Sequence, residues 1–143
     1  MNIPNDKKVV IASNHISSLD PFLLIAAANR PLRFMIAKEE YNKPVLNRIF
    51  KAAGCIPVDR GGRVDGAFKS AMRAINKGEI VTIFPQGGIH SIETPRKIIK
   101  PGIMRLSQLT NSYILPVRIT GVKAPGSMVR CLIYRGDVNF EVH

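Results

Sequence analysis

The stretch KVVIASNHISSLDPFLLIAAAN, from Lys8 to Asn29, joins two local patterns through a polar loop. Its first part, Lys8–Ala12, is a short apolar, β-branched run that predicts a buried strand. Its last part, Pro21–Asn29, starts with a proline suited to the first turn of a helix and continues as an apolar helical segment. A strand followed directly by a helix is the repeating unit of α/β proteins, so this stretch predicts the fold class.

The same alternation continues along the chain. Further strands are expected at Leu32–Ala37, Cys55–Val58, Ile80–Phe84 and Ile114–Thr120, and further helices at Val45–Ala53, Val64–Asn76 and Gly102–Thr110. The segment Val129–Val142 is predicted to form one or two strands without a helix between them. We therefore expect an α/β fold with a mostly parallel, mixed-edge sheet and helices on both faces, as a single domain over residues 1–143.

The composition narrows the choice of partners. The chain has 21 Lys and Arg against 10 Asp and Glu, a net charge of +11, and such a field attracts polyanions. Its few aromatic residues follow no nucleic-acid-binding pattern, so nucleic acid is not expected. The longest apolar run, Phe22–Ala28, is far shorter than the ~18 residues that cross a bilayer. Since the N-terminus also lacks a signal-peptide pattern, we expect a cytoplasmic protein.

Cysteines and histidines are not arranged as metal ligands. Cys55 and Cys131 stand in apolar surroundings without a CxxC spacing, which predicts reduced thiols in the core. His15, His90 and His143 share no ligand spacing. We expect neither a metal nor a cofactor.

The loop Asn14-His15-x-x-x-x-Asp20 lies where a strand ends and a helix begins, which is where open α/β sheets usually bind ligands. A histidine and a carboxylate five residues apart in a tight loop can form a hydrogen bond that fixes the imidazole tautomer and stabilises the imidazolium. This arrangement predicts a general base with its orienting acid. Taken singly, Asp20 could instead be an N-cap ahead of Pro21, and His15 an ordinary loop histidine.

This loop resembles the first motif of the glycerol-phosphate and lysophosphatidate acyltransferases of the bacterial 1-acylglycerol-3-phosphate acyltransferase type. Three later stretches resemble the family's second, third and fourth motifs. The later stretches follow in the family's motif order and are Gly54–Arg60 (GCIPVDR), Phe84–Gly87 (FPQG) and Ile114–Val117 (ILPV). The resemblance covers about residues 5–122. It implies a glycerolipid acyltransferase-like fold and the transfer of a fatty acyl group from acyl carrier protein or coenzyme A to the hydroxyl of lysophosphatidate or a related lysophospholipid.

The resemblance also implies residue roles. His15 would be the general base, and Asp20 would orient it. Arg60 matches the arginine with which the family holds the acceptor's phosphate. A guanidinium suits that role because it binds phosphate oxygens in a bidentate fashion, although a solvated surface arginine is the alternative.

Two lysines are further candidates for substrate binding. Lys38 stands where the family often carries a lysine and would add positive charge to the phosphate site, unless it forms a surface ion pair with Glu39 or Glu40. Lys100 resembles the family's lysine near the third motif, and a solvated lysine is the alternative.

The third motif contributes Gln86 and Gly87 to the predicted substrate site. Gln86 occupies the place of the family's usual glutamate, and Gly88–Ser91 replaces the threonine and arginine that normally follow. Glutamine can donate and accept hydrogen bonds but cannot carry a carboxylate's charge, so the acceptor preference can differ from the family's.

The expected partners are therefore a lysophospholipid, an acyl carrier protein or coenzyme A thioester, and an anionic membrane surface. The positive charge would hold the protein peripherally at the inner face of the membrane. The apolar residues of Phe22–Ala28 are expected in the core rather than in contact with lipid. Two other functions stay open: a noncatalytic module that binds anionic lipid or nucleic acid on the same fold, and a hydrolase with Cys55 as nucleophile beside His15.

Overall fold

The computed structural model describes residues 1–62, 64–89, 101–122 and 137–142. None of the helices in these ranges is long and apolar enough to span a membrane. In chain order the elements are β1 (Val9–Ser13), α1 (Asp20–Ala27), β2 (Leu32–Ala37), α2 (Lys38–Tyr41), α3 (Pro44–Ala52), β3 (Ile56–Val58), α4 (Asp65–Asn76), β4 (Ile80–Ile83), α5 (Gly102–Thr110), β5 (Tyr113–Thr120) and β6 (Asn139–Val142).

Within the described ranges the strands form one six-stranded sheet in the order β3-β2-β4-β1-β5-β6. β1 pairs in parallel with β4 and β5, and β2 pairs in parallel with β3 and β4. β6 is antiparallel to β5. The predicted mostly parallel sheet with a mixed edge is therefore confirmed. β6 covers the end of the predicted segment Val129–Val142, whose earlier residues, 129–136, lie outside the described ranges.

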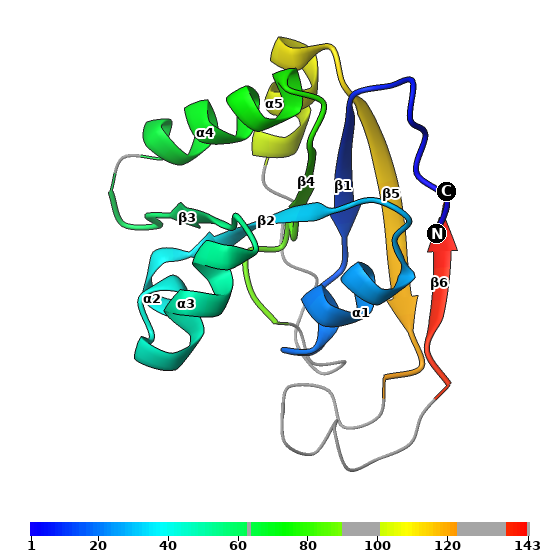
Figure 1. Ribbon diagram of the computed structural model, residues 1–143, viewed down its shortest axis with the longest axis horizontal. Coiled ribbons are helices and arrows are strands. Elements are labelled where there is room, and N and C mark those ends of the chain that lie inside the picture. The colour runs from blue at the N-terminus through cyan, green and yellow to red at the C-terminus, as the bar shows by residue number, and fades with distance from the viewer. Residues whose placement is uncertain (63, 90–100, 123–136, 143) are drawn as a thin grey trace.

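Helices cover both faces of the sheet, as predicted. Leu24 of α1 packs in one buried cluster with Ile11 of β1. Ala71 of α4 and Leu106 of α5 pack in a second cluster with Val10, the neighbour of Ile11 on β1. Figure 1 shows α4 and α5 next to each other, away from α1. β1 supplies side chains to both clusters, which explains why its first four residues, VVIA, are continuously apolar rather than alternating.

The apolar residues of Phe22–Ala28 were expected in the core, but not all of them are buried. Leu24 is fully buried, but Phe22 is 44% exposed and Ile25 is 47% exposed. The run Phe22–Ala28 is apolar around the whole circumference of the helix, while the sheet covers only part of it. The prediction of a buried helix is therefore wrong for Phe22 and Ile25.

Candidate active site

The residues singled out in the sequence follow the carboxyl ends of parallel strands. His15 comes after β1, Lys38 after β2, Arg60 after β3 and Gln86 after β4. Because parallel strands end at one edge of a sheet, the loops that carry these residues share that edge. It is the edge at which open α/β sheets bind ligands.

His15 and Asp20 are in direct contact. His15 Nδ1 lies 2.9 Å from Asp20 Oδ2, and the side chains of the two residues are 17% and 0% exposed. An ionised carboxylate can only accept a hydrogen bond, so Nδ1–H donates and the lone pair is left on Nε2. The contact expected from the spacing is present. That the pair works as base and orienting acid stays a prediction.

Asp20 also closes the loop that carries His15. Its Oδ2 accepts hydrogen bonds from the backbone N–H groups of Ile16, at 2.6 Å, and Ser17, at 2.8 Å. α1 begins at Asp20 itself, and its N-terminus has no side-chain cap hydrogen bond. The N-cap interpretation is therefore wrong, because the carboxylate turns back toward the preceding loop instead of capping the helix that follows.

A turn after β4 holds His15 at two further points. The His15 ring stacks on Phe84, with ring centroids 4.2 Å apart and planes inclined by 19°. The His15 backbone N–H donates to Gln86 Oε1 at 3.0 Å. Gly87 closes this turn, since its N–H donates to the carbonyl of Phe84 at 2.9 Å. Its φ of 73° lies in the left-handed region that favours glycine.

Asn14 fastens the same loop to β5. Its side-chain amide donates to the carbonyl of Ile119 at 2.9 Å, and its side-chain oxygen accepts from the N–H of Ile119 at 2.6 Å. This role was not predicted. The signal for it in the sequence is weak, because nothing near Asn14 points to a partner 105 residues away.

A cavity of about 610 Å³ opens beside His15. Its lining is mainly apolar and includes Met35, Phe50, Phe68 and Leu106, which come from four different elements. The volume lies within the roughly 300–1,000 Å³ typical of small-molecule sites. The imidazole therefore borders a space suited to a largely apolar ligand.

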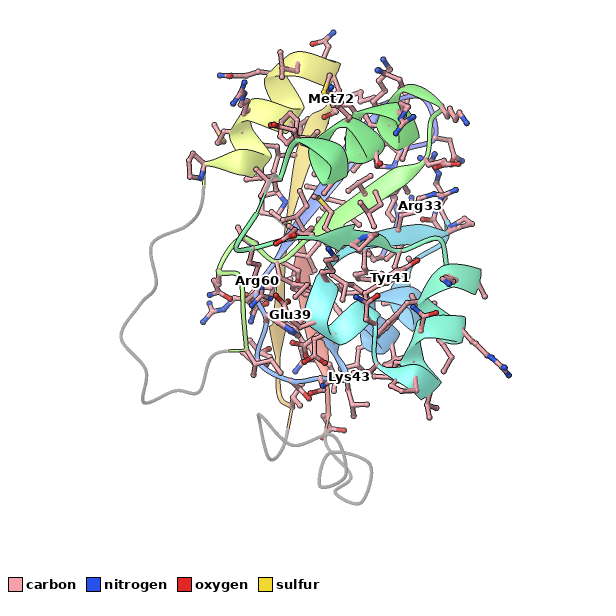
Figure 2. The ribbon with its side chains drawn as sticks, turned by 90° about the vertical axis from the view of Figure 1, so that its left-hand side faces the viewer. Arg33, Glu39, Tyr41, Lys43, Arg60 and Met72 are labelled. Atoms are coloured by element: carbon pink, nitrogen blue, oxygen red, sulfur yellow. The ribbon has the colours of Figure 1, made fainter. Side chains whose placement is uncertain are left out.

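Arg60 lines the same cavity, from a turn that Asp59 orders. Asp59 Oδ1 accepts the N–H of Gly61 at 3.1 Å, and its Oδ2 lies 3.5 Å from Lys38 Nζ. Within the described ranges Arg60 forms no ion pair, which leaves its guanidinium available to an anionic ligand. In Figure 2 Arg60 lies toward the end of the molecule that carries α2, away from Met72.

Lys38 is tied to this turn through Asp59. Neither predicted alternative is seen among the described residues, because the ion pair of Glu40 is with Lys43, at 2.6 Å, and Glu39 forms none. Lys38 is also not one of the described residues that line the cavity. Its charge is thus shared with Asp59 rather than directed to the cavity.

The remaining predicted site residues fall in three groups. Gly87 lines the cavity, whereas Gln86 is not among its described lining residues. Lys100 lies outside the described ranges. Among the residues that are described, no group of three or more His, Cys, Asp or Glu could hold a metal ion.

Cys55 is poorly suited to be a nucleophile. It is buried and is not one of the described residues that line the cavity. Burial raises the pKa of its thiol, against smaller lowering effects of a hydrogen bond with the backbone of Phe34 and the charge of Arg33. A raised pKa keeps the thiol protonated and unreactive.

The fold and the site together define an α/β protein with a buried acid, a histidine and an apolar cavity at the carboxyl edge of its sheet. A family model described as Acyltransferase matches residues 1–120. The chain belongs to this acyltransferase family, as the four motifs predicted.

Two curated relatives are similar over most of the chain. The "Probable 1-acyl-sn-glycerol-3-phosphate acyltransferase" of Mycoplasma genitalium is 31% identical over 122 residues, which cover 80% of this chain and 45% of the relative. The 1-acyl-sn-glycerol-3-phosphate acyltransferase of Bacillus subtilis is 27% identical over 121 residues, which cover 84% of this chain and 59% of the relative. The chain thus spans about half the length of the curated relatives it matches.

A solved structure supports the fold. The 1-acyl-sn-glycerophosphate acyltransferase PlsC of Thermotoga maritima matches with a TM-score of 0.75 at 21% identity, over 99% of this chain and 56% of that chain. The predicted glycerolipid acyltransferase-like fold is therefore confirmed.

Proposed function

We propose that the chain transfers a fatty acyl group from an acyl carrier protein or coenzyme A thioester to the hydroxyl of lysophosphatidate or a related lysophospholipid. The observation that carries this proposal is the hydrogen-bonded pair His15 and Asp20 beside a largely apolar cavity. The pair supplies a base, and the apolar lining suits an acyl chain. The relatives from Mycoplasma genitalium and Bacillus subtilis are named for 1-acyl-sn-glycerol-3-phosphate, which supports this acceptor.

The reaction follows from the tautomer of His15. Nε2 takes the proton of the acceptor hydroxyl while the oxygen attacks the thioester carbonyl carbon. Asp20, bonded to Nδ1 at 2.9 Å, stabilises the imidazolium that forms. The tetrahedral intermediate then expels the thiolate, which takes the proton from Nε2 and leaves as a thiol. An ester bond has formed, a thioester bond has broken, and the base is regenerated without an acyl group on the protein.

Arg60 would bind the phosphate of the acceptor. It lines the cavity that His15 borders, and its guanidinium can make two charge-assisted hydrogen bonds to phosphate oxygens. Lys38 would act indirectly, because its ion pair with Asp59 helps to hold the turn that carries Arg60. Phosphate held at Arg60 would direct the hydroxyl of the acceptor toward Nε2.

The mouth of the cavity supports contact with a lipid surface. Three large apolar side chains of its lining are exposed: Phe22 is 44% exposed, Val64 is 51% exposed and Ile89 is 39% exposed. We call these three residues the cavity rim. Exposed apolar side chains beside the same cavity as Arg60, together with a net charge of +11, suit binding to an anionic membrane. Each Lys or Arg near such a surface contributes on the order of 1 kcal/mol to the binding free energy. A substrate could then enter the cavity from the lipid.

The test of catalysis is acyl transfer by the purified chain. Labelled acyl-coenzyme A and acyl-carrier-protein thioesters are supplied with a panel of lysophospholipids that includes lysophosphatidate. We expect acylated lysophospholipid from the wild type, loss of at least 10²-fold in rate for His15→Ala, and wild-type rate for the matched control His143→Ala. A wild type that acylates no lysophospholipid, or a His15→Ala variant within tenfold of it, would refute the proposal.

Vesicle sedimentation tests the lipid contact. We expect the chain to bind vesicles containing anionic lipid better than neutral ones, and less as salt is raised. Serine at all three positions of the cavity rim should weaken binding about tenfold further at high salt, since each substitution removes exposed apolar surface that lipid would cover. Leu109→Ser, at a 55% exposed site on α5, is the control. Equal binding by all variants would exclude the rim, and tighter binding to nucleic acid than to anionic vesicles would favour the noncatalytic module.

A further inference from the structure

The side-chain oxygen of Gln86 is used by His15. Oε1 accepts the backbone N–H of His15 at 3.0 Å, although the two residues are 71 positions apart in the sequence. Gln86 is not among the described residues that line the cavity, whereas its neighbour Gly87 is. Gln86 therefore faces the loop that carries the candidate base rather than the space into which an acceptor would enter.

His15 is thereby held by three side chains from two loops. Asp20 fixes the ring through Nδ1, and Phe84 covers a face of the ring at a centroid distance of 4.2 Å. Gln86 fixes the backbone from which the ring projects. A general base must reach its proton within hydrogen-bond distance, and a displacement of about 1 Å can cost on the order of 10²-fold in rate. The rate of proton transfer therefore depends on the position of the His15 backbone as well as on the contacts of its ring.

We propose that Gln86 is a positioning residue for His15 and that its neutral amide provides the hydrogen bond without adding a negative charge beside the base. The inference rests on the proposed acyl transfer for its catalytic meaning. A glutamate, which the third motif usually has at this place, could accept the same hydrogen bond. Its carboxylate would, however, add a second anion at the loop that carries the imidazole, 3.0 Å from the backbone nitrogen of His15.

The charged groups around His15 determine how strongly a carboxylate at position 86 would affect protonation of the imidazole. Asp20 touches the ring, and Glu40 and Arg60 line the same cavity. Glu40 is paired with Lys43 at 2.6 Å, which reduces its effect on the imidazole. A carboxylate at position 86 would stabilise imidazolium, so the base would remain protonated and inactive to higher pH.

Two substitutions separate positioning from acceptor binding. Gln86→Leu removes the accepting oxygen, and Gln86→Glu keeps it and adds a charge. Gln108→Leu, the same change at an exposed site on α5, is the matched control. Nuclear magnetic resonance gives the exchange rate of the His15 backbone amide and the titration of its imidazole, and neither measurement needs activity. Kinetics across pH give kcat and the acceptor KM for acyl transfer.

We expect Gln86→Leu to speed exchange of the His15 amide at least tenfold and to lower kcat by about 10²-fold, with the acceptor KM within twofold of wild type. Gln86→Glu should keep slow exchange, move the imidazole titration and the acidic limb of kcat to higher pH, and recover kcat at alkaline pH. Gln108→Leu should change none of these.

Unchanged amide exchange in Gln86→Leu, or a raised acceptor KM at constant kcat, would overturn the proposal and restore Gln86 as an acceptor contact. If Gln86→Leu does not fold, Gln86→Glu decides, because an imidazole titration at the wild-type pH would also overturn it. A wild type without acyl transfer would refute the proposed function alone. The exchange and titration results would still decide the position of Gln86.

Discussion

Replacing Asp20 with asparagine is expected to weaken the fold and the proposed reaction separately. Asp20 is fully buried, and its Oδ2 accepts hydrogen bonds from the His15 ring at 2.9 Å and from the N–H groups of Ile16 and Ser17 at 2.6 and 2.8 Å. An amide oxygen can occupy the same place without the charge. Since a hydrogen bond to a charged group contributes roughly 1.5–3 kcal/mol and a neutral one roughly 0.5–1.5, each bond loses about 1 kcal/mol.

Three such bonds on one oxygen are not independent, so Asp20→Asn should lower the free energy of unfolding by about 2 kcal/mol rather than by the full sum. The amide nitrogen must also take the place of Oδ1, which is buried and has no hydrogen-bond partner in the described part of the chain. The reaction should suffer more, because a neutral amide does not stabilise imidazolium. We expect kcat to fall about 10²- to 10⁴-fold.

Urea unfolding and acyl-transfer kinetics on the same preparations measure the two effects. Asp65→Asn is the matched control, because Asp65 is the first residue of α4 as Asp20 is of α1, but is exposed rather than buried. The control should stay within about 0.5 kcal/mol of wild type. A kcat of Asp20→Asn within tenfold of wild type would refute the role of the acid in the reaction. An unchanged free energy of unfolding for Asp20→Asn would refute the stabilising contribution of the three hydrogen bonds to the charged Oδ2.

Two further substitutions test other parts of the site. Arg60→Lys should raise the acceptor KM at least tenfold and leave the acyl-donor KM unchanged, because an ammonium lacks the bidentate fork of a guanidinium. Steady-state kinetics with each substrate varied in turn measures both KM values. Equal rises in the two would contradict phosphate binding by Arg60. In a Cys131→Ser background, Cys55 should react with iodoacetamide at least tenfold more slowly in the native than in the urea-unfolded chain, since burial raises the pKa of its thiol. Rapid native alkylation, followed by mass spectrometry, would reopen the interpretation of Cys55 as a nucleophile.

The elements that could be predicted well are those whose boundaries are set locally. Leu32–Ala37 follows a proline, and Gly102–Thr110 begins after one, and both were predicted with the bounds that the structure has. The short helix α2, Lys38–Tyr41, was not predicted. Its four residues, KEEY, are too few for an apolar periodicity to appear, and none of them is buried.

The same distinction between local and distant contacts applies to the site. The contact between His15 and Asp20 could be predicted because both lie in one loop, five residues apart. The contacts of Asn14 with Ile119 and of His15 with Gln86 span 105 and 71 residues. Predicting them requires the order of strands in the sheet, which an alternation of strands and helices does not specify.

The strand order explains why the candidate base is held so firmly. β1 lies between β4 and β5, so the loop after β1 has a neighbouring strand on each side. β5 binds Asn14, and the turn after β4 binds His15, one residue further along. On an edge strand only one of these two contacts would be available. A central strand therefore lets two sequence-distant segments fix one short loop, and substitutions in either segment can alter the position of His15 without touching a substrate.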